Sequence, residues 1–215
     1  MKKYLKLQYL FYQVFFLLII LATGCTDGDM KSADATEPEV KTLSHDELVE
    51  RGKFIALVGD CGICHTPKKM TDKGPVFDDS KMLSGYPEGM QLPPINMKAV
   101  TNDHWVLMEP GTQAFVGPWG VSFAYNLTPD STTGIGGWDE ETFIRAMRTG
   151  MHMGAEKGRP IMPPMPWENL KQLSDEDLKA LYTYLRTIPP IKNRVPDYIS
   201  PDQLSNNQTI TLVNQ

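Results

Sequence analysis

The residues best suited to chemistry are two cysteines and a histidine, Cys61, Cys64 and His65, in the run CGICH. Two thiols three positions apart can each add to one vinyl group of a haem. The histidine beside the second thiol then lies under the iron as an axial ligand. This spacing predicts one covalently attached haem c, and the cofactor rather than a side chain would carry the chemistry.

Two other chemistries use a C-x-x-C pair. A dithiol redox pair favours a βαβ context, and no such pattern surrounds Cys61. A structural zinc site usually needs four thiolate or imidazole ligands. No cysteine follows Cys64, and His104 and His152 are the only histidines after His65. Both alternatives stay open from the residues alone, and we favour haem attachment.

The N-terminus has the pattern of an export signal. Lys2, Lys3 and Lys6 form a basic start, and an uncharged, largely apolar stretch follows before Cys25. This order is typical of the n-region and h-region of a signal peptide. A glycine directly before a cysteine resembles a bacterial lipoprotein signal. The resemblance predicts a signal peptide over 1–24 and a lipid on Cys25.

The match to lipoprotein signals departs at Ala22, where such signals usually carry leucine. The alternative is an uncleaved anchor helix, because the uncharged stretch is about long enough to span a bilayer. Both interpretations place the folded part outside the cytoplasm. We therefore expect an exported protein, anchored to a membrane and facing the periplasm or the cell exterior of a bacterium.

The charge balance bears on the class of partner. The chain has 21 basic and 26 acidic side chains, and removal of residues 1–24 changes the net charge from −5 to −8 because only lysines are lost. The sequence has no basic stripe, so contact with nucleic acid is not predicted. An acidic carrier favours partners that have basic docking patches.

The chain divides into four segments by composition. After the signal peptide, residues 25–43 contain few large apolar side chains and are predicted to form a flexible tether. Residues 44–194 are long enough for one domain with one core. Residues 195–215 form a polar C-terminal tail that either wraps the domain or hangs free.

Three helices are predicted from their end signals and their apolar stripes. They run from the Ser44 N-cap to Gly59, from the Asp139 N-cap to Gly150, and from the Ser174 N-cap to Pro189. A short helix over 167–172 and a hairpin between 113–117 and 121–124 are further expectations. Gly-rich and Pro-rich loops join these elements. The predicted fold class is mainly α, with long loops and a small β-hairpin insertion.

A second axial ligand decides whether the iron transfers electrons or reacts with small molecules. Residues 159–167 hold Met162 and Met165 among four prolines. Prolines lower the entropy of an open loop, and this helps a weak thioether ligand to stay bound. A methionine opposite a histidine also raises the reduction potential. We choose Met165 as the distal ligand and Met162 as the second choice.

Other interpretations of these side chains remain. Methionines often fill cores. Met151, His152 and Met153 form another candidate cluster for the distal ligand. His104 is expected to be a surface or packing residue, and His45 is expected to be solvated in the first turn of a helix.

The chain resembles a class I-type monohaem cytochrome c, and within that class the cytochrome c domains that accompany periplasmic alcohol, aldehyde and gluconate dehydrogenases. The matching stretches span most of 44–194. They are CGICHTP (61–67), LSG (83–85), NLTPDSTTGIGGWDEETF (126–143), RAMRTG (145–150), MPPMPW (162–167) and LSDEDLKALYTYLRTIPP (173–190).

The resemblance implies a cytochrome c-like helical fold around one covalently bound haem. It assigns Cys61 and Cys64 as thioether sites, His65 as proximal ligand and Met165 as distal ligand. It further implies that the first and last helices cross near the haem, with close approach at Gly52 against aromatics such as Tyr182, and that Trp138 and Arg148 lie near the haem edge or propionates. Dehydrogenase-linked subunits commonly carry three haem motifs, whereas this chain carries one.

The predicted function is one-electron transfer by a membrane-tethered carrier that is not itself an enzyme. Its partners would be a redox donor and a redox acceptor, such as a periplasmic dehydrogenase or a terminal oxidase. One alternative is a haem enzyme or ligand sensor of peroxidase-like type, with an open distal site served by His104 or His152. Another is an electron-transfer subunit that works only within a dehydrogenase complex.

Overall fold

The computed structural model describes residues 42–100 and 105–206. The predicted signal peptide, Cys25, nearly all of the predicted tether, His104 and the last residues of the tail lie outside the described residues. In the ranges that are described, no helix is both long enough and apolar enough to cross a membrane.

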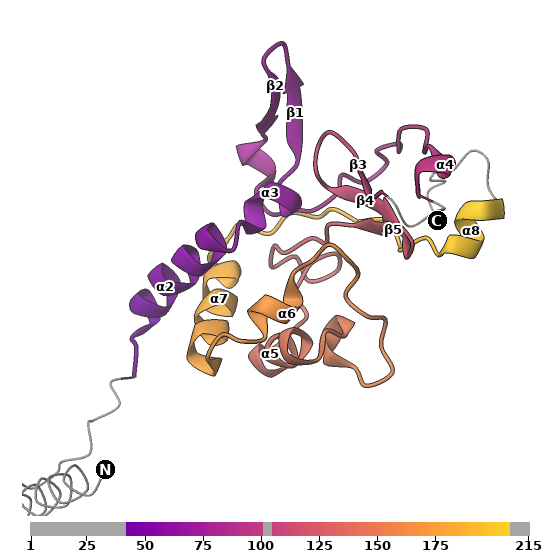
Figure 1. Cartoon of the computed structure of the whole chain (residues 1–215). Helices are drawn as coiled ribbons and strands as arrows, with labels where there is room; N and C mark the ends of the chain where they lie inside the picture. Colours follow the sequence, from indigo (N-terminus) through magenta and orange to yellow (C-terminus); the bar gives the residue numbers. More distant parts are fainter. Residues whose placement is uncertain (1–41, 101–104, 207–215) are drawn as a thin grey trace, which may run out of the picture. The chain divides into compact units, whose positions relative to one another are not determined.

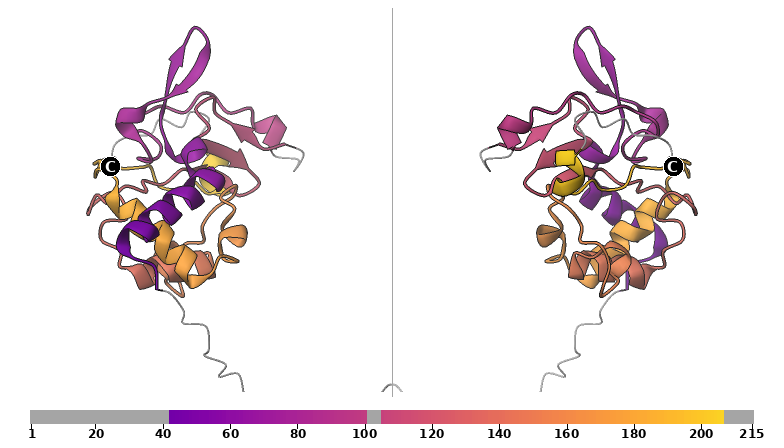
Figure 2. Two further views of the ribbon diagram at one scale, coloured as in Figure 1. Left: turned by 90° about the vertical axis from the view of Figure 1, so that its left-hand side faces the viewer. Right: turned by 90° about the vertical axis from the view of Figure 1, so that its right-hand side faces the viewer.

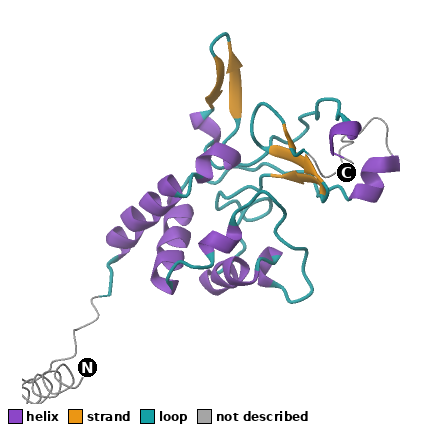
Figure 3. Ribbon diagram, viewed as in Figure 1, coloured by secondary structure: helices purple, strands orange, loops and turns teal. Residues whose placement is uncertain are grey.

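Helices form one side of the domain, and the three predicted helices are confirmed (Figures 1 and 3). In chain order this side contains α2 (His45–Val58), α3 (Cys61–His65), α5 (Glu140–Thr149), η2 (His152–Gly154), α6 (Trp167–Leu170) and α7 (Asp175–Thr187). The helix α6 confirms the short helix expected over 167–172.

The ends of the long helices are set by local sequence. Ser44 caps α2 and forms a reciprocal capping box with Glu47. Asp139 accepts a hydrogen bond from the Thr142 N–H at 2.8 Å at the start of α5. Gly150 ends that helix in the left-handed region, at φ 68°. These elements therefore need little tertiary information to begin and end where they do.

The helices α2 and α7 cross with almost no space between their backbones. A Cβ added at Gly52 would lie 2.0 Å from the Ala180 carbonyl oxygen and 2.7 Å from the Tyr184 Cβ. The predicted close approach at Gly52 is therefore confirmed, but Tyr182 is not the partner. The Tyr182 ring packs on Phe143 instead, with ring centroids 5.6 Å apart.

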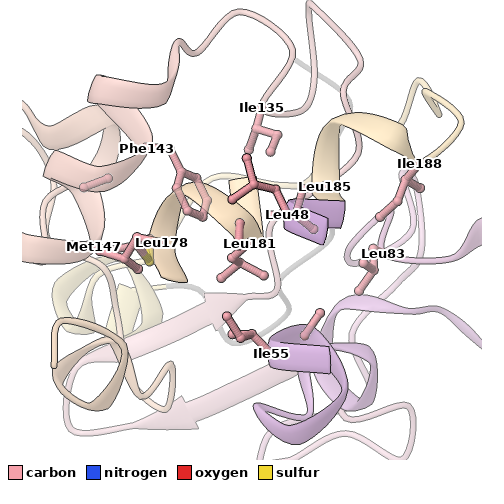
Figure 4. Packing of buried hydrophobic residues seen from close by; sticks show 13 residues of the cluster. Leu48, Ile55, Leu83, Ile135, Phe143, Met147, Leu178, Leu181, Leu185 and Ile188 are labelled. Carbon is pink, nitrogen blue, oxygen red and sulfur yellow. The ribbon is translucent and has the colours of Figure 1, made fainter. Parts of the chain in front are cut away.

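The main core lies where α2, α5 and α7 meet (Figure 4). Apolar side chains of all three helices are buried there, and loop residues close the cluster. Its largest members are Leu48, Ile55, Leu83, Ile135, Phe143, Met147, Leu178, Leu181, Leu185 and Ile188. Burial of each large apolar side chain contributes roughly 1.5–3 kcal/mol.

Small antiparallel sheets occupy the other side of the domain. The predicted hairpin is confirmed as β4 (Ala114–Gly117) and β5 (Gly120–Phe123). A short strand, β3 (Leu107–Met108), extends this sheet in the order β3-β4-β5. The short helix α4 (Met97–Val100) places buried Val100 in the small core beside this sheet.

A second hairpin, β1 (Lys68–Thr71) and β2 (Gly74–Phe77), projects from the domain (Figures 1 and 2). The sequence does not predict it, because almost every residue of both strands is exposed and no apolar alternation marks them. The 3-10 helix η1 (Asp79–Lys81) follows it.

The C-terminal segment wraps the domain as far as it is described. Ile199 forms an antiparallel bridge with Val121 of β5. The helix α8 (Pro201–Asn206) then places Leu204 in the small core beside the sheet, where its side chain is buried. Asn193 precedes this segment and donates to the carbonyls of Ser84 and Tyr86.

A carboxylate organises the loop that leads into α5. The Asp130 side chain accepts hydrogen bonds from the hydroxyls and the backbone N–H groups of Thr132 and Thr133. The bond from the Thr133 hydroxyl is the largest cause that lowers the pKa of Asp130 to about 2. The ionised carboxylate thus holds the turn that precedes Trp138.

Gly52→Ala should destabilise the fold, because a Cβ has no room at the α2–α7 crossing. Overpacking of this kind costs about 1–3 kcal/mol or more of the free energy of unfolding. Denaturant unfolding followed by far-ultraviolet circular dichroism measures the loss. Gly137→Ala is the matched control, since an added Cβ there meets only ordinary contact at 3.5 Å. Equal stability of the two variants would contradict the crossing.

Acid should weaken the Asp130 turn. Its pKa is depressed on folding from about 3.9, so its contribution to stability is present above the unfolded pKa and is lost as the pH falls through about 2. Urea unfolding at pH 5 and pH 2 should therefore show a smaller loss in Asp130→Asn than in the wild type. Asp72→Asn, in an exposed turn, should behave as the wild type does. An equal loss in all three proteins would argue against the turn.

Candidate functional site

The two thiols lie on α3, a helix of five residues. Residues three apart on a helix share a face, so Cys61 and Cys64 point to the same side. Both are free and partly buried. Burial raises the pKa of Cys61 to about 11, and burial is also the main cause of the raised pKa of Cys64. Dithiol oxidoreductases instead lower the pKa of the attacking thiol, so this environment does not favour that alternative.

The imidazole of His65 is buried and oriented by one backbone group. Its Nδ1 lies 2.7 Å from the carbonyl oxygen of Tyr125. A carbonyl only accepts hydrogen bonds, so Nδ1 carries the hydrogen and Nε2 keeps its lone pair. Burial also lowers the pKa of His65, which favours the neutral ring. A neutral imidazole with a fixed Nδ1–H is the form in which histidine binds a metal through Nε2.

The backbone around His65 is fixed by the segment 83–85. The Gly85 N–H donates to the His65 carbonyl at 2.7 Å, and the Leu83 N–H donates to the Thr66 hydroxyl at 3.1 Å. Gly85 has φ 80°, and a Cβ there would lie 2.6 Å from the Ala124 carbonyl oxygen. Residues 83–85 are the LSG stretch of the family resemblance. They therefore hold the end of α3 against the residues beside Tyr125.

Lys68 holds α3 from the other side. Its ammonium donates to the carbonyls of Ile63 and Gly111 and to the Thr112 hydroxyl. Burial lowers the pKa of Lys68. This side chain joins the thiol-bearing helix, at its middle residue Ile63, to the loop before β4.

The segment with the two candidate methionines is tied to β5. The Ser122 hydroxyl donates to the Pro163 carbonyl at 2.5 Å. The segment 159–167 is called the methionine loop below. Ser122 lies three residues before Tyr125, so the anchor of this loop and the anchor of His65 are at most about 10 Å apart. The structure thus attaches His65 and the segment with the two candidate methionines to the same short stretch of chain.

Both methionines in this loop are half-buried. The Met165 carbonyl accepts from the Trp167 N–H at 2.9 Å, and the Trp167 ring fills the space over Gly150. The Met162 carbonyl accepts a longer bond, at 3.3 Å, from the Met165 N–H. The backbone at Met165 is therefore fixed from the α6 side.

The other candidate ligands are placed differently. His45 is exposed at the start of α2, and Met153 is 46% exposed. His152 packs edge-on against the rings of Tyr125 and Trp138, at centroid distances of 5.3 and 5.4 Å.

Arg148 is engaged away from this aromatic cluster. Its guanidinium donates to the Lys171 carbonyl and to the Asp175 carboxylate, the latter at 2.5 Å. These bonds join α5 to the start of α7. Trp138 instead lies beside Tyr125, the residue whose carbonyl holds His65.

Tyr125, Lys68 and Ser122 are the site residues that the sequence did not indicate. Tyr125 acts through its backbone carbonyl, which every residue has, so no side-chain pattern marks it. Ser122 and Lys68 contact carbonyls far along the chain, 41 and 43 positions away. No local signal identifies such pairs.

The residues present fit a haem. Two thiols share a face of α3, and an oriented imidazole follows them with a free Nε2. Within the described ranges no three His, Cys, Asp or Glu side chains gather as a metal site. When haem c is bound, Cys61 and Cys64 would hold it covalently and His65 would bind its iron.

Comparison with known proteins agrees with this geometry. The family model described as "Cytochrome c" matches residues 49–189. The gluconate 2-dehydrogenase cytochrome c subunit of Pantoea cypripedii is 31% identical over 163 residues, which are 75% of this chain and 28% of that protein. A subunit of the nicotinate dehydrogenase of Pseudomonas putida is 30% identical over 164 residues, which are 76% of this chain and 10% of that protein.

The fructose dehydrogenase cytochrome subunit of Gluconobacter japonicus is 28% identical over 160 residues, 74% of this chain and 25% of that protein. The chain thus spans between a tenth and about a quarter of the length of these relatives. The expectation of a mainly helical cytochrome c domain with some β structure is confirmed. The chain belongs to the cytochrome c family, whose cofactor is covalently bound haem c.

Proposed function

We propose that this protein is a membrane-tethered carrier that transfers one electron at a time through a haem c. In this proposal Cys61 and Cys64 form the thioether bonds, and His65 and Met165 are the axial ligands. The observation that carries the proposal is the hydrogen bond from His65 Nδ1 to the Tyr125 carbonyl. It orients a buried, neutral imidazole for iron.

Each residue has a distinct task. The cysteines fix the cofactor so that it cannot exchange during repeated reactions. The Tyr125 carbonyl accepts from His65 and makes the ring a stronger electron donor through Nε2. Met165 supplies a neutral thioether, and the prolines around it limit the motion of the loop. When bound, haem c supplies a one-electron iron couple whose potential is raised by the methionine.

Met165 is preferred over Met162 because the resemblance assigns the Met165-Pro166 pair as the distal ligand. The Trp167 N–H supports this choice, since it donates to the Met165 carbonyl at 2.9 Å. The open-site alternative would need a polar distal group. His152, one of the two candidates for that group, packs edge-on against the rings of Tyr125 and Trp138.

A dehydrogenase is the proposed redox partner. Relatives are named as cytochrome subunits of gluconate and fructose dehydrogenases, and such subunits carry electrons rather than catalyse the oxidation. We propose that this chain takes electrons from a periplasmic dehydrogenase and passes them to a second redox protein, such as a terminal oxidase. The proposed location is a bacterial membrane, with the domain facing the periplasm or the cell exterior.

Met165→Ala should open the iron to external ligands. The wild-type haem is expected to be low-spin in both redox states and to exclude carbon monoxide. The variant should bind carbon monoxide and favour the oxidised state by at least tenfold, which for one electron is about 59 mV. Visible spectra and a redox titration measure both effects. Met162→Ala, in the same loop, should leave both unchanged; the reverse pattern would assign Met162 as the ligand.

Cys25→Ser should release the protein from membranes, because a lipid on Cys25 is the proposed tether. Fractionation of cells that produce the full chain, followed by haem staining, measures where the protein lies. Ser32→Ala, elsewhere in the predicted tether, is the control and should stay bound. Tight retention of Cys25→Ser would instead support an uncleaved anchor helix over the N-terminal apolar stretch.

A further inference from the structure

The ammonium of Lys68 is held at the base of the projecting hairpin by groups from three segments. It donates to the Ile63 carbonyl of α3, to the Gly111 carbonyl at 2.5 Å and to the Thr112 hydroxyl at 2.5 Å. The ring of Phe77, the residue opposite Lys68 in the hairpin, lies 5.3 Å from the nitrogen. Three oxygens and an aromatic ring therefore fix the position of one positive charge.

The Ile63 carbonyl lacks a donor within its own helix. In an α-helix this oxygen would accept from the N–H four residues further on, but residue 67 is a proline and has no N–H. Lys68 and the Thr112 hydroxyl donate to it instead, the latter at 2.6 Å. Lysine side chains that follow a helix can satisfy such carbonyls. The sequence after His65 thus leaves an acceptor that Lys68 fills.

The turn that meets Lys68 is organised by a buried carboxylate. Glu109 accepts from the Gly111 N–H at 2.5 Å and from the Gln113 N–H at 2.7 Å. Thr112, between these two residues, has φ 60°, in the left-handed region that few residues other than glycine adopt. The carboxylate therefore holds the turn in the conformation that presents the Gly111 carbonyl and the Thr112 hydroxyl to the ammonium.

The same turn is joined to the segment that supports His65. The Gln113 side chain donates to the Gly85 carbonyl at 2.7 Å, and the Gly85 N–H donates to the His65 carbonyl. The strand β4 begins at Ala114, directly after Gln113. The β3-β4-β5 sheet thus fixes the turn on one side, and α3 is attached to it on the other.

The contact of Lys68 lies within the CGICH motif. Ile63 separates Cys61 from Cys64, the two proposed attachment points of the haem. Burial raises the pKa of the Cys64 thiol, and the charge of Lys68 opposes that rise. The ammonium therefore lies close to the second thiol and is bonded to the carbonyl that precedes it.

The charge of Lys68 has no ion-pair partner in the described part of the chain. Lys69, the next residue of the strand, pairs with the Asp78 carboxylate at 2.9 Å. Burial lowers the pKa of Lys68, and the carboxylates of Glu109 and Asp60 are among the charges that oppose this change from a distance. The ammonium therefore remains able to act electrostatically on a bound cofactor.

We propose that Lys68 fixes a positive charge against the haem-bearing helix and thereby raises the reduction potential of the iron. The inference rests on the proposed function, because it needs a haem attached at Cys61 and Cys64. Oxidised iron carries one more positive charge than reduced iron, so a nearby ammonium disfavours oxidation. Lys68 is a positioning residue in this arrangement and not a ligand.

The test compares Lys68→Gln with Lys73→Gln in the matured haem protein. Lys73 is exposed in the turn of the same hairpin, so both variants lose one positive charge. Redox titration should show that Lys68→Gln favours the oxidised state about threefold more than Lys73→Gln does, which is about 28 mV for one electron. Both variants should keep the low-spin spectrum and exclude carbon monoxide. Lys68→Arg, which keeps the charge, should keep the wild-type potential.

A measurement on the wild-type protein tests the contact even if Lys68→Gln does not mature. Acetic anhydride modifies exposed lysines, and peptide mass spectrometry of the haem protein reports each site. Lys68 should lose most of its reactivity relative to Lys73, because oxygens and a ring enclose its ammonium. Equal modification of the two lysines would show a free ammonium and would contradict the proposal.

Equal potentials in Lys68→Gln and Lys73→Gln would overturn the assignment, and so would a potential in Lys68→Arg as low as that of Lys68→Gln. A lower potential that comes with carbon monoxide binding would also overturn it, because a loosened ligand rather than a lost charge would be the cause. If the wild type titrates by one electron while the two glutamine variants are equal, the carrier function stands and the role of Lys68 fails. A wild type without a one-electron haem couple would end both proposals.

Discussion

The structure depends on one hydrogen bond, from Nδ1 of His65 to the backbone carbonyl of Tyr125. A buried imidazole needs a partner for its N–H, and a charged ring would be costly in this position. The carbonyl satisfies the N–H, fixes the tautomer and leaves Nε2 free. The segment 83–85, β5 and the methionine loop all attach within a few residues of this bond. The arrangement of the site follows from that constraint.

The rest of the fold supplies rigidity around this point. The α2–α7 crossing at Gly52 has no room for a side chain, and α2 ends at Val58, shortly before α3 begins at Cys61. Lys68 then joins the Ile63 carbonyl of α3 to the Gly111 carbonyl and the Thr112 hydroxyl. An electron carrier benefits from such rigidity, because its ligands need to keep their positions when the charge of the iron changes. In this account the helical body and the small sheet fix the two segments that carry the proposed ligands.

Features encoded by neighbouring residues were predictable from the sequence. Ser44, Asp139 and Ser174 cap their helices through bonds to residues three positions away, and the thiols and His65 share one short motif. The pairing of His65 with Tyr125 spans 60 positions and uses a carbonyl that any residue has. Arg148 was placed near the haem by resemblance, but its partners are Asp175 and Lys171.

The central claim is that the iron is closed by His65 on one side and by a methionine on the other. The most direct measurement is the visible spectrum of the reduced, matured wild-type protein before and after exposure to carbon monoxide. A low-spin haem c spectrum that does not change with the gas is the predicted result. A spectrum that is high-spin, or that shifts at once to a carbon monoxide complex, would contradict closed coordination and would indicate a site for ligands or catalysis.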